Sequence, residues 1–111
     1  MDMNLYNILI DLARSDRLAS YGEVAPSIGL NMALEEDRDE IARRLGEIVR
    51  YEFEANRPML TSLIVHYGDD NNPGEGYFSI ASELGLYSGS RNPIEKLTFW
   101  AGQVRDVYNH W

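Results

Sequence analysis

The chain has 111 residues, and its 10 Lys and Arg against 18 Asp and Glu give a formal net charge of −8. This length and a hydrophobic content of 44% suit one domain with a modest core, so we expect residues 1–111 to fold as a single unit. Because cysteine is absent, disulfides, thiolate nucleophiles and Cys-ligated zinc or iron–sulfur clusters are excluded. Any chemistry must use oxygen and imidazole groups.

No apolar stretch approaches the roughly 20 residues that span a bilayer, and no basic segment leads into an apolar run near Met1. We therefore expect a cytoplasmic protein without a membrane partner.

Two helices are predicted before residue 30. Apolar residues at positions 5, 8, 9 and 12 recur with helical spacing and predict a helix over residues 4–13. Ser20 precedes Glu23 by three residues, which is the spacing of a capping box. It predicts a short helix over 21–28, closed by Gly29.

A third helix is predicted from about Arg38 to Tyr51, because apolar residues at positions 41, 45, 48 and 49 mark one buried face. Its segment 38–50 carries four arginines and three acids. These charges have spacings that allow ion pairs within the helix, so a solvated outer face is one interpretation and a basic binding face is the other. The acids of 35–40 oppose the helix dipole favourably and would repel phosphate on the same side.

The C-terminal half mixes strand and helix signals. Residues 60–66 are rich in Leu, Ile and Val and predict a strand, followed by a turn over 67–74. The apolar spacing of 77–84 favours a helix that ends before Gly85. Asn92 as N-cap and Pro93 as the first helical residue predict a last helix to residue 111.

This order of elements predicts an α+β fold: a small winged helix-turn-helix-like domain with an added C-terminal helix. The first helix lies within 1–18, the winged-helix-like core is 19–85, and the added helix is 93–111.

Residues 19–85 resemble the DNA-binding domain of alkyltransferase-like proteins and O6-alkylguanine-DNA alkyltransferases. Their Tyr-Gly-x-hydrophobic-Ala-x-x-hydrophobic-Gly motif matches residues 21–29, Tyr-Gly-Glu-Val-Ala-Pro-Ser-Ile-Gly. Their Ala-Arg-x-Val-Gly motif matches residues 42–46, Ala-Arg-Arg-Leu-Gly. The family then has Pro-Cys-His-Arg or Pro-Trp-His-Arg before a hydrophobic strand, and this chain has Pro58-Met59 before the apolar residues 63–65. A later Pro-Gly-x-x-Gly-Tyr-like loop of the family is similar to Pro-Gly-Glu-Gly-Tyr at residues 73–77.

The resemblance implies that Tyr21 and Arg43 turn a nucleotide out of a duplex, because an aromatic group and a planar cation can displace a base and fill its gap. In the same arrangement Arg44 and Arg50 would contact phosphates, and a wing over residues 69–76, with Gly74 and Gly76, would approach the DNA backbone. Met59 stands where the family has its reactive cysteine, or the tryptophan of the alkyltransferase-like group. A thioether has no proton to lose, so alkyl transfer is excluded.

Other catalytic patterns are weak. His66 lies near Asp69 and Asp70, but a loop histidine beside acids is more often a surface feature than a metal ligand. The segment 69–72 lacks the alternating ligands and the distant glutamate of a calcium loop. Residues 73–76 lack the Lys-Ser/Thr continuation of a phosphate-binding loop. We predict no catalytic residue, no metal and no cofactor.

The sequence thus predicts a non-catalytic nucleic-acid-binding protein whose partner is duplex DNA. The alternative is an acidic protein-binding module, such as an inhibitor, an immunity or anti-defence protein, or an accessory subunit, because a charge of −8 disfavours DNA and attracts a basic protein partner. An unrecognised hydrolase is a third and weaker hypothesis.

Overall fold

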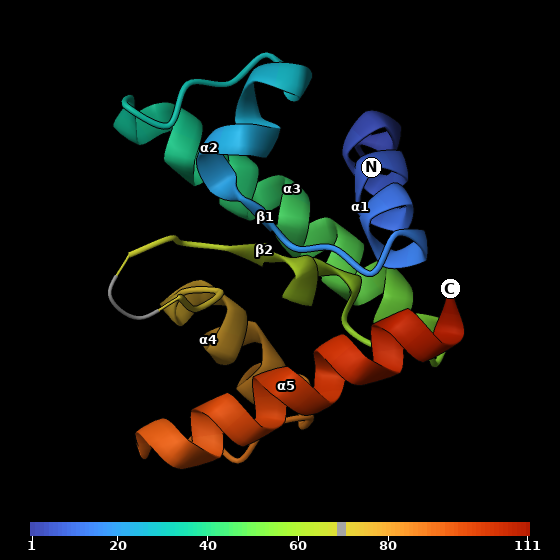
Figure 1. The fold of residues 1–111 in the computed structure, drawn as a ribbon. Helices are drawn as coiled ribbons and strands as arrows, with labels where there is room; N and C mark the ends of the chain where they lie inside the picture. The colour runs from blue at the N-terminus through green and yellow to red at the C-terminus, as the bar shows by residue number, and fades with distance from the viewer. Residues whose placement is uncertain (69–70) are drawn as a thin grey trace.

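The computed structural model describes residues 1–68 and 71–111, which form a mostly helical α+β protein (Figure 1). The α-helices are α1 (Met3–Arg14), α2 (Tyr21–Val24), α3 (Glu35–Glu54), α4 (Glu75–Glu83) and α5 (Pro93–His110). The remaining elements are two short strands, β1 (Ala19–Ser20) and β2 (Ile64–Val65), and two 3-10 helices, η1 (Ala25–Ile28) and η2 (Leu60–Leu63). Within the described ranges, no helix combines the length and the apolar character needed to cross a membrane.

The predicted helix starts are confirmed by their caps. The Oγ of Ser20 accepts a hydrogen bond from the backbone N–H of Glu23 at 3.1 Å, and the side chain of Asn92 accepts from the N–H of Ile94 at 2.8 Å. The helix predicted over 21–28 is α-helical in α2 and continues as the 3-10 helix η1, which ends at Gly29 with φ 76°. α3 begins earlier than predicted, and its first turn holds three acids that favourably oppose the helix dipole.

The strand predicted over 60–66 is wrong for its first part, because residues 60–63 form η2 and only Ile64–Val65 are extended. β2 pairs in parallel with β1, with Ala19 opposite Ile64 and Ser20 opposite Val65. Residues 59–65 are all buried. Their apolar composition reflects burial on every side, and composition alone does not separate a buried strand from a buried helical turn.

The expected wing is reduced to one backbone bridge in the described residues. His66 and Asn72 form an isolated antiparallel bridge, with the N–H of His66 donating to the carbonyl of Asn72 at 2.8 Å. Tyr77 lies in α4, as the helical spacing favoured, and does not begin a return strand. Asp69 and Asp70 of the predicted wing lie outside the described residues. The winged-helix arrangement therefore stays a prediction.

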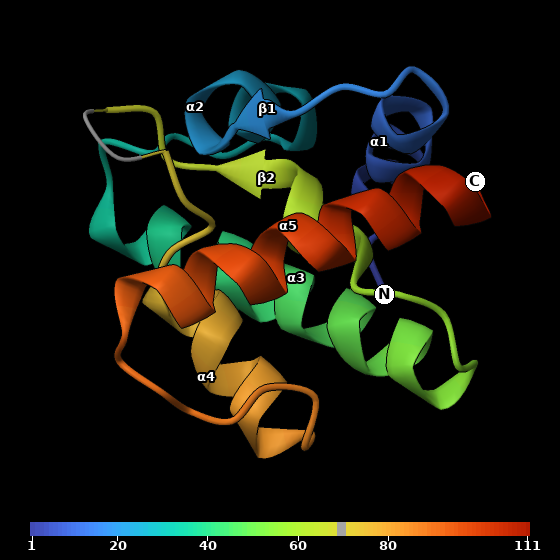
Figure 2. The same ribbon diagram turned by 60° about the horizontal axis from the view of Figure 1, so that its bottom comes forward.

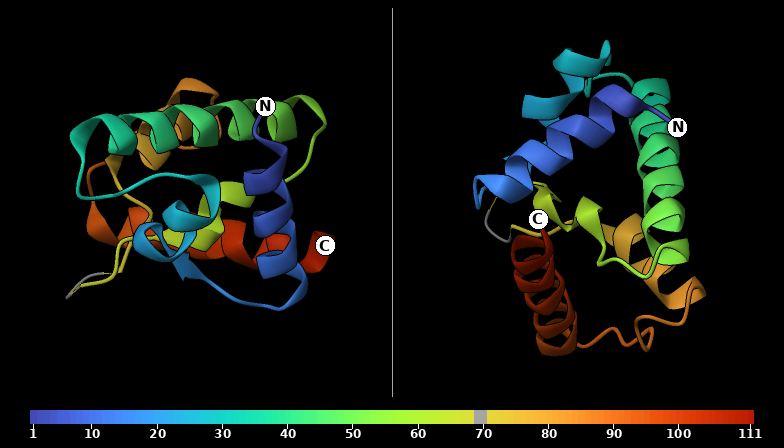
Figure 3. Two further views of the ribbon diagram at one scale, coloured as in Figure 1. Left: turned by 90° about the horizontal axis from the view of Figure 1, so that it is seen from above. Right: turned by 90° about the vertical axis from the view of Figure 1, so that its right-hand side faces the viewer.

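Two hydrophobic clusters build the core around η2. The first joins α1, α3 and η2 through fully buried side chains that include Leu5, Leu9, Ile48, Leu60 and Leu63. The second joins Val49 of α3 and Met59 to the α4 residues Tyr77, Phe78 and Ala81. In the side view of Figure 3, β2 and η2 lie between α1 and α5, with α3 alongside. The short buried segment 59–65 is thus enclosed by helices from both ends of the chain.

α5 is attached to this segment by two hydrogen bonds. The indole Nε1 of Trp100 donates to the carbonyl of Ser62 at 2.8 Å, and the side chain of Gln103 accepts from the N–H of Met59 at 2.9 Å. Figure 2 shows α5 running across the molecule between α4 and the C-terminal end of α1. α5 therefore fixes the position of η2, and η2 contributes to the lining of the pocket described next.

Candidate functional site: the Tyr21 pocket

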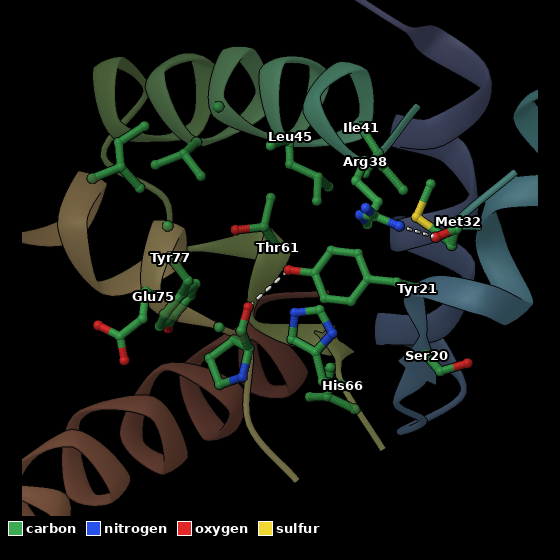
Figure 4. A pocket seen from close by; sticks show the side chains of 18 of the residues that line it. Ser20, Tyr21, Met32, Arg38, Ile41, Leu45, Thr61, His66, Glu75 and Tyr77 are labelled. Carbon is green, nitrogen blue, oxygen red and sulfur yellow. Dashed lines mark hydrogen bonds between the residues drawn. The ribbon is translucent and has the colours of Figure 1, made fainter. Parts of the chain in front are cut away.

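A pocket of about 640 Å³ lies between α2, one face of α3, the β2–α4 connection and α4 (Figure 4). We name it the Tyr21 pocket. Its polar and aromatic lining includes Tyr21, Arg38, Thr61, His66, Glu75 and Tyr77. Its apolar lining includes Ile41, Leu45, Val49, Val65 and Ile80. A volume of this size, with apolar walls and a few convergent polar groups, is typical of sites that bind small organic ligands.

Tyr21 occupies the centre of this pocket. It is the first residue of α2, and its ring stacks on the imidazole of His66, with centroids 4.3 Å apart and planes at 21°. Its hydroxyl donates a hydrogen bond to the carbonyl of Pro73 at 2.7 Å, drawn as a dashed line in Figure 4. Burial raises the pKa of Tyr21 to about 12, so the phenol is neutral at physiological pH. The group is a planar, neutral surface with a polar tip.

Gly74 and Gly76, both predicted as site residues, also line the pocket, but only Gly74 is conformationally constrained. Gly74 has φ 93°, and a Cβ built on it would lie 3.0 Å from Nε2 of His66. At Gly76 an added Cβ would meet nothing within 4 Å. Gly74 therefore allows the close approach of backbone and imidazole that supports the Tyr21–His66 stack.

The structure brings Thr61, and not Met59, to this pocket. Met59, which the resemblance placed at the position of the reactive cysteine, is 2% exposed and belongs to the second hydrophobic cluster. Thr61 lies in η2, lines the pocket and is 5% exposed. Its Oγ1 is buried and has no hydrogen-bond partner among the described residues.

The three predicted DNA-contacting arginines of α3 are bound to carboxylates. Arg43 pairs with Glu40 at 2.6 Å and with Glu47. Arg44 pairs with Asp2 at 3.0 Å and also with Glu40, and Arg50 pairs with Glu83 at 2.6 Å. Hydrogen bonds from Arg43 and then Arg44 lower the pKa of Glu40 to about 2. The ion-paired interpretation of this face is the one that the geometry favours.

Arg38 is the α3 cation that reaches the pocket. It shares a helix face with Ile41 and Leu45, both of which line the pocket, whereas Arg43 points to the face that carries Glu40 and Glu47. Its guanidinium donates to the carbonyl of Met32 at 2.9 Å and forms no ion pair with a described residue. Tyr21 and Arg43, paired by the resemblance, therefore do not share this site.

The described residues contain no group of three or more His, Asp or Glu side chains that could hold a metal ion. The combination of His66 with Asp69 and Asp70, which the sequence did not favour as a metal site, has its two acids outside the described residues. Glu75, at the edge of the pocket, is paired with Lys96 at 2.9 Å.

Arg38, Thr61 and His66 line the pocket, but sequence reasoning did not predict any of them as a binding residue. Arg38 had a usable signal, because it precedes Ile41 and Leu45 by three and seven residues and so lies on the buried face. Thr61 and His66 had none. Their roles depend on the 3-10 turn of η2 and on the packing of the β2–α4 connection against α2.

Comparison with known protein families, with curated proteins and with solved structures gives no match for this chain.

Proposed function

We propose that this protein is a non-catalytic nucleic-acid-binding protein that seats one base in the Tyr21 pocket. The observation that carries the proposal is the stacked pair of Tyr21 and His66 inside a pocket of about 640 Å³. Proteins hold extruded or unstacked bases by stacking them on aromatic side chains and by hydrogen bonds to their edges. The resemblance of residues 19–85 to alkyltransferase-like proteins supports the same function.

The winged-helix interpretation is part of this proposal. α2 with η1 and then α3 correspond to the helix-turn-helix, and the connection from His66 to Gly74 corresponds to the wing. Arg38 replaces Arg43 as the arginine beside the base, because Arg38 lines the pocket and Arg43 is held by two glutamates. A guanidinium is planar and suits either a base or a phosphate.

The negative charge of the chain determines how strongly nucleic-acid binding should depend on the salt concentration. A net charge of −8 repels nucleic acid at long range, and the paired arginines of α3 offer little compensation. The affinity must then come from the pocket more than from phosphate contacts. We therefore expect a shallow salt dependence, with log K falling by about one unit per tenfold increase in salt, as for a single phosphate contact.

The test is a titration of labelled duplexes and single strands that contain a guanine, an alkylated guanine or an abasic site, each over a salt series. The expected result is saturable binding that weakens at the abasic site and in Tyr21→Ala. Arg38→Ala should reduce the salt slope by about one, and Arg43→Ala, the matched control on the same helix, should leave it unchanged. No saturable binding at low salt, or equal binding to abasic and intact strands, would overturn the proposal.

The second candidate is an acidic module that binds a basic protein. It is favoured by the ion pairs of α3, which neutralise Arg43, Arg44 and Arg50. The three acids in the first turn of α3 then give the N-terminal end of this helix a negative surface that a basic protein could contact. Capture from the native host should recover a stoichiometric basic partner, and Glu35→Lys combined with Glu36→Lys should weaken its association rate at low salt. Recovery of no such partner contradicts this function.

A further inference from the structure

One polar group of the Tyr21 pocket has no hydrogen-bond partner among the residues that the structure describes. Oγ1 of Thr61 is buried and forms no hydrogen bond with any described residue. Figure 4 shows Thr61 among the residues that line the pocket. Because buried polar groups in folded proteins almost always have a partner, its position requires a physical explanation.

The polar groups around Thr61 are satisfied without it. The hydroxyls of Ser62 and Tyr77 form a hydrogen bond of 2.6 Å, and the carbonyl of Ser62 accepts from Trp100 at 2.8 Å. The hydroxyl of Tyr21 donates to Pro73 at 2.7 Å. The fold of η2 therefore does not use the Thr61 hydroxyl.

A valine would fill the same space without leaving a polar atom unpaired. Thr and Val have the same shape, and replacing an unsatisfied buried hydroxyl by a methyl group removes a desolvation penalty. The threonine thus makes the free protein less stable than it could be. Residues that lower the stability of the free protein in this way are expected in binding sites, where a ligand can supply the missing hydrogen bond.

We propose that Thr61 is the specificity-determining residue of the Tyr21 pocket, and that its hydroxyl forms a hydrogen bond with the inner polar edge of the bound base. This inference rests on the proposed function and adds the group that recognises the base. A hydroxyl can donate or accept, so a carbonyl oxygen, a ring nitrogen or an amino group of a base can satisfy it. An aromatic ligand that presents only C–H groups leaves it unpaired, and a site built for a hydrogen bond rejects such a ligand.

The binding test compares wild type with Thr61→Val, which removes the hydroxyl, and Thr61→Ser, which keeps it. The probes are labelled short single strands with one variable position: each natural base, a naphthyl C-nucleoside that stacks but has no hydrogen-bonding edge, and an abasic site. The measured quantity is the affinity for the preferred natural base divided by the affinity for the naphthyl strand. This ratio should be about five to ten times larger for wild type than for Thr61→Val. Thr61→Ser should keep the wild-type ratio. The same ratio in wild type and Thr61→Val would overturn the inference while the proposed function stands.

The second readout is the stability of the three proteins without nucleic acid. Thr61→Val should unfold at the same or a higher denaturant concentration than wild type while it loses base discrimination. A valine variant that unfolds more easily would show that the hydroxyl has a partner in the free protein and would overturn the inference. If wild type binds abasic and intact strands equally, the proposed function itself fails, and that result does not depend on either Thr61 variant.

Discussion

The imidazole of His66 lies against the phenol of Tyr21, with ring centroids 4.3 Å apart and planes at 21°. This contact joins the start of α2 to the residue that follows β2. It is held from the other side by the backbone of Gly74, which leaves no room for a Cβ beside the imidazole. The start of α2 and the two ends of the β2–α4 connection therefore form one wall of the Tyr21 pocket.

Gly74→Ala should destabilise the protein and disturb this wall. The added methyl group would lie 3.0 Å from Nε2 of His66, and φ at Gly74 is 93°, which L side chains rarely adopt. The expected loss is about 1–3 kcal/mol of the free energy of unfolding, measured by urea denaturation. In the proposed function, base binding should weaken in the same variant.

Gly76→Ala is the matched control, because an added Cβ there meets nothing within 4 Å and the residue lies in the first turn of α4. Replacing a helical glycine by alanine reduces the entropy of the unfolded chain, so this variant should be more stable than wild type by about 0.4–1 kcal/mol. Equal destabilisation by the two alanines would contradict the assigned role of Gly74.

The stability of the protein should fall in alkaline solution partly through Tyr21. Burial raises the pKa of Tyr21 to about 12 from an ordinary value of 10.0. Since the folded state holds the phenol proton more tightly than the unfolded chain, this contribution is complete below about pH 10 and is lost as the pH rises from 10 to about 12.

Tyr21→Phe cannot ionise at this position, so its stability should decline less steeply over the same pH range. The measurement is the free energy of unfolding of both proteins by urea at about pH 9, 10 and 11. Wild type should lose stability relative to Tyr21→Phe between about pH 10 and pH 11. Parallel curves for the two proteins would show that Tyr21 is not the shifted group.

Glu52→Gln should be strongly destabilising, because Glu52 is 0% exposed and its carboxylate joins α1 to the end of α3. It accepts from the hydroxyl of Tyr6 at 2.7 Å and from two nitrogens of Arg57 at 2.9 and 3.0 Å. Removing its charge leaves the partly buried guanidinium of Arg57 uncompensated, with an expected loss of about 3 kcal/mol.

Glu47→Gln, on the same helix, provides the comparison for Glu52. Glu47 pairs with Arg43 at the surface, where ion pairs contribute little, so its loss should change stability by no more than about 1 kcal/mol. Thermal unfolding followed by circular dichroism measures both variants. Similar midpoints for Glu47→Gln and Glu52→Gln would be inconsistent with a buried ion pair at Glu52.

Two tryptophans of the C-terminal segment should respond differently to the same substitution. Trp100→Phe removes the hydrogen bond to the buried carbonyl of Ser62 and should lower stability by about 1–3 kcal/mol. Nε1 of Trp111 is buried without a partner among the described residues, so Trp111→Phe loses no such bond. Urea denaturation should therefore show the larger loss for Trp100→Phe. An equal loss would mean that the hydrogen bond from Trp100 to Ser62 does not contribute to stability.

Local signals in the sequence were sufficient to predict most helices. Ser20 and Asn92 cap the helices that follow them, and the apolar positions predicted for α1 and α3 identify their buried faces. These features depend on residues within one or two turns of each other, so they are visible in the sequence. The α+β class and the absence of thiol chemistry follow from the sequence in the same way.

The pocket itself depends on the tertiary structure. The sequence could not place Thr61 instead of Met59 at the pocket, because residues 59–65 are all buried and packing decides which of their side chains line it. Helical spacing places Arg38 on the face of Ile41 and Leu45 and Arg43 beside Glu40 and Glu47, but only the packing of α3 makes the first of these faces a wall of the pocket. The negative charge of the chain is likewise a property of the sequence. The pairing of Arg43 with Glu40 and Glu47 follows helical spacing, but the ion pairs of Arg44 with Asp2 and of Arg50 with Glu83 depend on the fold, because they join segments that are distant in the sequence.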